Sequence, residues 1–173
     1  MQENRLPHYD MSVNTTGCCP RFDPAGWDGQ VLHFNDKPFL RATTRSENHV
    51  PQDMAEVFSR VNAHMQQAGA FDPDNFIVLS HDPSAETGEH FFAVSKPVPD
   101  EEMVELSGDF VTRVFDGPYQ DGPRWQAEME AVVRARGAEP DRIFFFYTTC
   151  PKCAAAYGHN YVVGVAEIPA QAG

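Results

Sequence analysis

Basic residues are scarce in this 173-residue sequence. Lys and Arg together number 13, against 25 Asp and Glu, and the formal net charge is −12. A field of that sign repels phosphate groups. We therefore expect neither nucleic acid nor an anionic membrane surface as a partner.

Long apolar runs and two common catalytic loops are also missing. No apolar run approaches the ~20 residues of a membrane-spanning helix, and the opening stretch MQENRLPHYDMSVNTTG has no apolar core like that of a secretory leader. We therefore expect a cytoplasmic protein. The sequence has no G-x-S-x-G elbow and no glycine-rich phosphate loop, which disfavours a serine-triad esterase and a nucleotide-binding enzyme.

Apolar and aromatic residues are plentiful, and their order repeats. Hydrophobic residues make up 42% of the chain, which indicates a folded core. Two segments show the spacing of a helix and lie 68 residues apart: Val57, Val61 and Met65, then Trp125, Met129 and Val133. Each segment is followed by a glycine, Gly69 or Gly137, where a left-handed cap suits the residue without a Cβ.

Strand patterns surround both predicted helices. A strand precedes each helix, at 37–44 and 109–115, and two follow it, at 76–79 and 88–94 in the first copy and at 143–147 and 158–163 in the second. The sequence therefore predicts an α+β fold of two tandem β-α-β-β repeats related by a pseudo-two-fold axis. Antiparallel sheets would carry the helices on one face and leave a groove between the copies.

These boundaries define one compact domain with three parts. An irregular N-terminal arm at 1–30 precedes a first repeat at 31–98 and a second at 104–169. Two unrelated α+β halves are the alternative interpretation. A second copy of the chain could cover apolar edges between the copies, so a homodimer is a further possibility.

Two short motifs carry a resemblance to a known family. Val114-Phe115-Asp116-Gly117-Pro118-Tyr119 precedes the Trp-bearing helix, and Glu167-Ile168-Pro169 ends the last strand. With the repeat order over 31–169, they resemble the gyrase-inhibitor-like (GyrI-like) small-molecule-binding domains. That resemblance implies that an amphipathic or cationic small molecule binds in the groove between the copies.

Two additions look like a bacterial stand-alone subgroup of that family, labelled hydrolases. They are the cysteine-bearing arm at 18–24 and the loop at 150–159, which runs into Y-G-H-N-Y at 157–161. The resemblance implies hydrolysis of a small aromatic or electrophilic compound in the groove. A non-catalytic ligand-binding or sequestering protein and a thiol redox or metal-handling protein are the alternatives.

The four cysteines form two pairs, Cys18-Cys19 and the C-P-K-C motif of Cys150 and Cys153. In a reducing compartment such pairs more often bind metal or act in redox chemistry than form disulfides. The C-x-x-C spacing lets two thiolates share a tetrahedral ion, and His159 follows in the same loop. We expect a zinc ion on Cys19, Cys150, Cys153 and His159, with Cys18 as the alternative ligand, because adjacent cysteines rarely reach one ion together. A redox dithiol or plain reduced thiols remain alternatives.

Aromatic side chains would line the predicted groove. Stacking on a ligand's π-face or cation is expected of Tyr119, Trp125, Tyr147 and Tyr161. Ordinary core packing is the alternative for each.

Glu167 is the predicted catalytic residue. Strand alternation places it on the face of Tyr161 and Val165, where a carboxylate is costly to bury unless it is paired, protonated or bound to a ligand. By resemblance it would meet a cationic ligand or polarise a hydrolytic water, and exposure at the strand end is the alternative. Water bound to a metal at Cys150 and Cys153, the cysteine corner, is the other candidate nucleophile.

Overall fold

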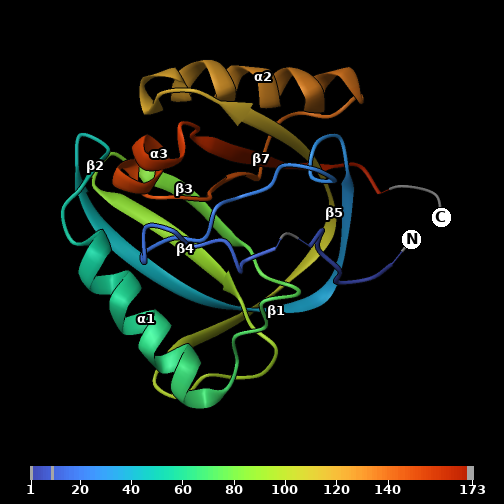
Figure 1. Cartoon of the computed structure of the whole chain (residues 1–173). Helices are drawn as coiled ribbons and strands as arrows, with labels where there is room; N and C mark the ends of the chain where they lie inside the picture. Colours follow the sequence, from blue (N-terminus) through green and yellow to red (C-terminus); the bar gives the residue numbers. More distant parts are fainter. Residues whose placement is uncertain (1, 9, 171–173) are drawn as a thin grey trace.

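A closed antiparallel barrel of six strands is the centre of the computed structural model, which describes residues 2–8 and 10–170 (Figure 1). Around the barrel the strands follow the order β1-β4-β3-β6-β7-β5, and β5 pairs back onto β1. Their bounds are β1 Val31–Glu47, β3 Val78–Ser84, β4 Thr87–Ala93, β5 Glu102–Asp116, β6 Ile143–Tyr147 and β7 Tyr161–Ile168. The two-residue strand β2 (Val50–Pro51) adds to the end of β1.

The predicted fold class, tandem β-α-β-β repeats with helices on one sheet face and a groove between the copies, is wrong. Two strands are much longer than the sequence pattern indicated, 17 residues for β1 and 15 for β5. The first half of β1 pairs with β5 and its second half pairs with β4. A register shift between Phe34 and Lys37 accompanies this change of partner. The sheet therefore closes on itself, and no groove separates the two halves over the described residues.

The interior of the barrel is filled with side chains. One apolar cluster receives residues from all six strands, among them Phe39, Phe110 and Phe144. The N-terminal arm joins the same cluster through Phe22 and Trp27. The Phe22 ring meets Phe146 of β6 edge-on, with centroids 6.0 Å apart, and the Thr112 hydroxyl donates to the Trp27 carbonyl. The arm is thus part of the core.

The two longer helices pack on the outside of the barrel. In α1 (Met54–Ala68) the buried residues are Val57, Val61 and Met65, and in α2 (Gly122–Ala135) they are Trp125, Met129 and Val133, which confirms both predicted helical faces. The α1 cap at Gly69 is left-handed with φ 63°, as predicted. Among the described residues, no helix has the length and apolar character needed to cross a bilayer.

Close packing of α2 depends on one glycine. A Cβ built on Gly164 of β7 would lie 2.6 Å from the Met129 sulfur. A larger residue at position 164 would therefore force the Met129 side chain to move.

A buried histidine lies between α1 and the barrel. His90 is 2% exposed, and its ring nitrogens contact the Ser80 hydroxyl at 2.7 Å and the Thr44 hydroxyl at 2.9 Å. The Phe58 ring of α1 meets the imidazole edge-on at 5.1 Å. Burial lowers the pKa of His90 to about 4.

Replacing His90 will make the free energy of unfolding depend less on pH in the acid range. Between the unfolded pKa near 6.5 and the folded value of about 4, the unfolded chain binds the extra proton, so stability falls as pH falls. We expect His90 to account for about 2 kcal/mol of the loss between pH 7.5 and 5. Urea unfolding of wild type and His90→Gln at both pH values measures it. The exposed His49→Gln is the control, and an unchanged slope in His90→Gln would refute the assignment.

Candidate metal centre

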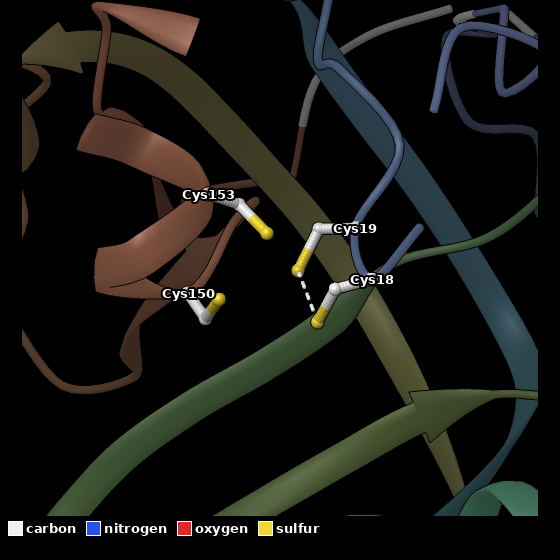
Figure 2. Close-up of side chains that lie close together, drawn as sticks. All are labelled: Cys18, Cys19, Cys150 and Cys153. Atoms are coloured by element: carbon white, nitrogen blue, oxygen red, sulfur yellow. Dashed lines mark hydrogen bonds between the residues drawn. The ribbon is translucent and has the colours of Figure 1, made fainter. Parts of the chain in front are cut away.

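Four thiols from distant parts of the chain lie together at one corner of the barrel (Figure 2). The Sγ atoms of Cys18, Cys19, Cys150 and Cys153 all lie within 4.8 Å of one another. The first two belong to the N-terminal arm, and the other two belong to the beginning of the short helix α3 (Pro151–Tyr157). All four are free cysteines.

The sequence around α3 explains how its two thiols meet. Pro151 occupies the first helical position, where its missing N–H is not needed, and Cys150 before it is extended. The Ala154 amide donates to the Cys150 carbonyl at 2.9 Å and closes the first turn. Residues three apart lie on the same side of a helix, so Cys150 and Cys153 present their sulfur atoms together.

Hydrogen bonds fasten the arm to α3 beside the thiols. The Tyr157 hydroxyl donates to the Cys19 carbonyl at 2.6 Å. The Thr16 Oγ1 lies 3.2 Å from the Cys153 Sγ. Gly17, with φ 73°, allows the tight turn that brings both cysteines of the arm to this corner.

The spacing of the sulfur atoms suits one tetrahedral zinc ion. Zn–S bonds of about 2.3 Å place the four sulfur atoms about 3.8 Å apart. The Cys18 and Cys19 Sγ atoms are 3.7 Å apart, and every other pair lies within 4.8 Å. A set of four thiolates is closed, which is typical of structural zinc sites.

The surroundings shift the pKa values of the thiols in different directions. Burial raises the pKa of Cys19, whereas the hydrogen bond from the Thr16 hydroxyl lowers the pKa of Cys153 to about 6. Thiolates this close repel one another, so a cation is required for all four to be deprotonated together.

His159, a predicted ligand, lies outside this group of thiols. Its Nδ1 is 2.8 Å from the Asp116 carboxylate at the end of β5. The structure instead brings both Cys18 and Cys19 into the group.

The four predicted ligand-binding aromatics lie in three different places. Trp125 is 2% exposed and stacks on Phe115 beneath α2. Tyr119 and Tyr147 lie near each other on the surface, with centroids 6.1 Å apart, and the Tyr119 hydroxyl donates to the Thr149 carbonyl. Tyr161 lies at the start of β7, stacked on His159.

Glu167, the predicted catalytic residue, is paired. Its carboxylate accepts a hydrogen bond from Arg142 Nε, and the same guanidinium donates to the Ser107 carbonyl at 2.9 Å. Glu167 is near the end of β7 opposite Tyr161, away from the cysteines. The ion pair explains how the carboxylate is accommodated on an apolar face.

The sequence did not indicate two sets of polar contacts, because each set joins side chains from different strands or loops. Glu89 of β4 contacts His81 at 2.5 Å and Arg41 of β1 at 2.6 Å, and these two partners lower its pKa although burial raises it. The second set is the contact between His159 and Asp116, which are 43 residues apart in the sequence. The Y-G-H-N-Y motif identified the histidine, but no local signal indicated its partner.

Residues 9–168 match the model of a family described as bacterial hydrolase. This match confirms the hydrolase-labelled family that the arm and the loop indicated. It gives no support to the GyrI-like assignment. No curated protein matches the chain.

Removing the Tyr157 hydroxyl will loosen the arm. Tyr157→Phe loses the hydrogen bond to the Cys19 carbonyl, which we expect to cost about 1 kcal/mol of unfolding free energy. Urea denaturation measures the change. Tyr147→Phe is the matched control, because that side chain is half exposed. Equal effects of the two variants would contradict the role given to Tyr157.

Proposed function

Because the chain belongs to the bacterial hydrolase family, we propose that it is a small-molecule hydrolase whose N-terminal arm is fastened to the barrel by one zinc ion. The observation that carries the metal part is the set of four Sγ atoms within 4.8 Å of one another. Zinc is the metal that such a thiolate set most often binds.

A zinc ion bound here supplies a crosslink between the arm and α3. Phe22 and Trp27, which follow Cys18 and Cys19 closely in the chain, pack in the barrel core. Metal binding is therefore coupled to the packing of the arm, and its free energy adds to the stability of the folded state.

The hydrolytic step belongs to protein side chains in this proposal. Four thiolates complete a tetrahedral shell and leave no position for an attacking water. A side chain that accepts a proton from water is therefore needed, and a carboxylate-oriented histidine is the usual group for that task.

Turnover of small electrophiles tests the hydrolase proposal directly. The zinc-loaded protein is assayed with a panel of esters, lactones and activated rings, and we expect hydrolysis above the buffer rate for at least one class. Saturable binding of a member of the panel without turnover would instead favour a sequestering protein.

The metal content of cysteine variants tests the ligand set. We expect roughly one zinc per chain in the wild type, and its loss in both Cys18→Ser and Cys150→Ser, because each removes one of four thiolates. His159→Ala will retain the metal, since its imidazole pairs with Asp116. Elemental analysis with thiol titration measures both quantities. Metal-free wild type with four titrating thiols, or zinc lost only in His159→Ala, would refute this site.

Chelation will release the arm. Arg21 is exposed but lies on a segment held between the thiols and the core residue Phe22. We expect trypsin to cut after Arg21 faster once a chelator removes the metal, and equally fast without chelator in Cys150→Ser. Mass spectrometry of timed digests follows this cut, with Arg113 inside β5 as the internal reference. If the chelator leaves the rate of cutting after Arg21 unchanged, the metal has no role in fastening the arm.

A further inference from the structure

The four thiols differ in how far solvent reaches them. Cys18 is exposed, Cys19 and Cys150 are partly buried, and Cys153 is fully buried. Each Sγ nevertheless lies within 4.8 Å of the other three (Figure 2). A small oxidant that arrives from solvent therefore meets the Cys18 sulfur first, and three further thiols lie beside that sulfur.

An exposed thiol beside other thiols is the arrangement in which reversible oxidation takes place. Oxidation by a peroxide depends on thiolate character and exposure, and the sulfenic acid that forms condenses with a neighbouring thiol to a disulfide. Metal binding requires the thiols to be deprotonated. A zinc-loaded site therefore presents to the oxidant the thiolate form that reacts.

The chain itself disfavours a disulfide between Cys18 and Cys19. Cα atoms of consecutive residues are about 3.8 Å apart, whereas a relaxed disulfide needs about 4.4–6.8 Å between its Cα atoms. The 3.7 Å between the two Sγ atoms therefore does not make these neighbours a suitable pair. The cysteines of the C-P-K-C motif come from a distant part of the chain, so this constraint does not apply to them.

A disulfide within the C-P-K-C motif is the other product to consider, because its spacing permits one. Such a bond would have to begin at a motif thiol. Cys153 is 0% exposed, and its Sγ lies 3.2 Å from the Thr16 hydroxyl oxygen. Cys150 is less exposed than Cys18. Oxidation that begins at the most exposed sulfur therefore leaves Cys18 as one half of the first disulfide.

We propose that the corner is a redox modification site at which hydrogen peroxide replaces the zinc crosslink with a disulfide between Cys18 and the C-P-K-C motif; the zinc part rests on the metal site proposed above. The Cys18 thiolate attacks one peroxide oxygen, the O–O bond breaks, and a sulfenic acid and hydroxide form. A motif thiolate then attacks the Cys18 sulfur, and the S–O bond breaks with loss of a second hydroxide.

The exchange balances without any further reactant. Each of the two sulfur atoms loses one electron, and the peroxide gains both. The two hydroxides take up protons from solvent and become water. Two of the four thiolates are then used up, so the metal is released and the remaining two thiolates are protonated by solvent.

This exchange changes the crosslink without freeing the arm. Phe22 and Trp27 follow Cys18 closely in the chain and pack in the barrel core. A disulfide from Cys18 would hold the segment at the same place as the metal, whereas chelation leaves four separate thiols. Oxidised protein and chelated protein thus both lack zinc, but they differ in how the arm is held.

Peptide mapping of the wild type identifies the disulfide. Zinc-loaded protein is treated with hydrogen peroxide, alkylated and digested with trypsin after unfolding. Trypsin cuts after Arg21 and after Lys152, which separates the two cysteines of the motif from each other and from the arm. We expect the peptide 6–21 to be joined to 143–152 or to the peptide that begins at 153, and a chromophoric chelator to report zinc release over the same time course.

The other products would refute the proposal. A link between 143–152 and the peptide that begins at 153 would mean that the motif oxidises by itself. A disulfide within 6–21 would mean that the adjacent cysteines pair, and unlinked peptides would mean that no disulfide forms. The expected linkage in a wild type that binds no zinc would refute the metal site alone.

Two adjacent variants test the part played by Cys18. Cys18→Ser and Cys19→Ser each remove one of the four thiolates and should lose zinc alike, so they differ only in which arm thiol is left. We expect the linked peptides to be lost in Cys18→Ser and to form in Cys19→Ser. Chelated wild type treated in parallel is the metal-free reference. Equal yields of linked peptide from the two variants would overturn the attack at Cys18.

Limited digestion of the folded protein tests the consequence for the arm. After treatment with peroxide and then chelator, we expect trypsin to cut after Arg21 as slowly as in zinc-loaded protein. Dithiothreitol should then raise the rate to that of chelated protein, because it reduces the disulfide. Arg113 inside β5 is again the internal reference. Oxidised protein that is cut as fast as chelated protein before reduction would show that the disulfide does not hold the arm.

Discussion

The pairing of β1 with β5 is the interaction on which the rest of the molecule depends. Without it the sheet would have two open edges, and each would expose a row of unpaired amide and carbonyl groups. With it the six strands enclose a single interior, which apolar side chains from every strand fill. The same closure sends the helices to the outside, because the inner faces of the strands are already covered by one another.

The arm belongs to this architecture although it has little regular structure. Phe22 and Trp27 enter the barrel core, while the thiols of Cys18 and Cys19 meet those of α3. Core packing and a four-thiol group thus hold the same short segment at two neighbouring points. A metal ion bound there would add its binding free energy at Cys18 and Cys19, which are less buried than Phe22 and Trp27.

Several histidines are paired with carboxylates in this acidic chain. His33 contacts Asp109, His49 contacts Asp82, His81 contacts Glu89 and His159 contacts Asp116. Pairing alone is therefore no sign of catalysis here.

Local patterns in the sequence were sufficient for α1 and α2 and for part of the site, whereas α3 lies where the sequence predicted a loop. Helical spacing located the buried faces of α1 and α2, and the C-x-x-C spacing with a second cysteine pair indicated a metal-binding corner. These features depend on residues within a few turns of one another or on side-chain chemistry alone. The closure of the barrel depends instead on residues 31–34 and 102–106, whose strand character the pattern did not show. Each of these segments pairs with residues some 60 to 80 positions away in the sequence.

Tertiary structure alone decided which side chains meet at the corner. The turn at Gly17 brings both Cys18 and Cys19 to the thiol group, although adjacent cysteines were expected to supply one ligand. His159, close to Cys153 in sequence, lies against Asp116 because β5 and β7 are neighbours in the barrel. Spacing along the chain determines which residues could meet, whereas strand pairing and packing determine which ones do.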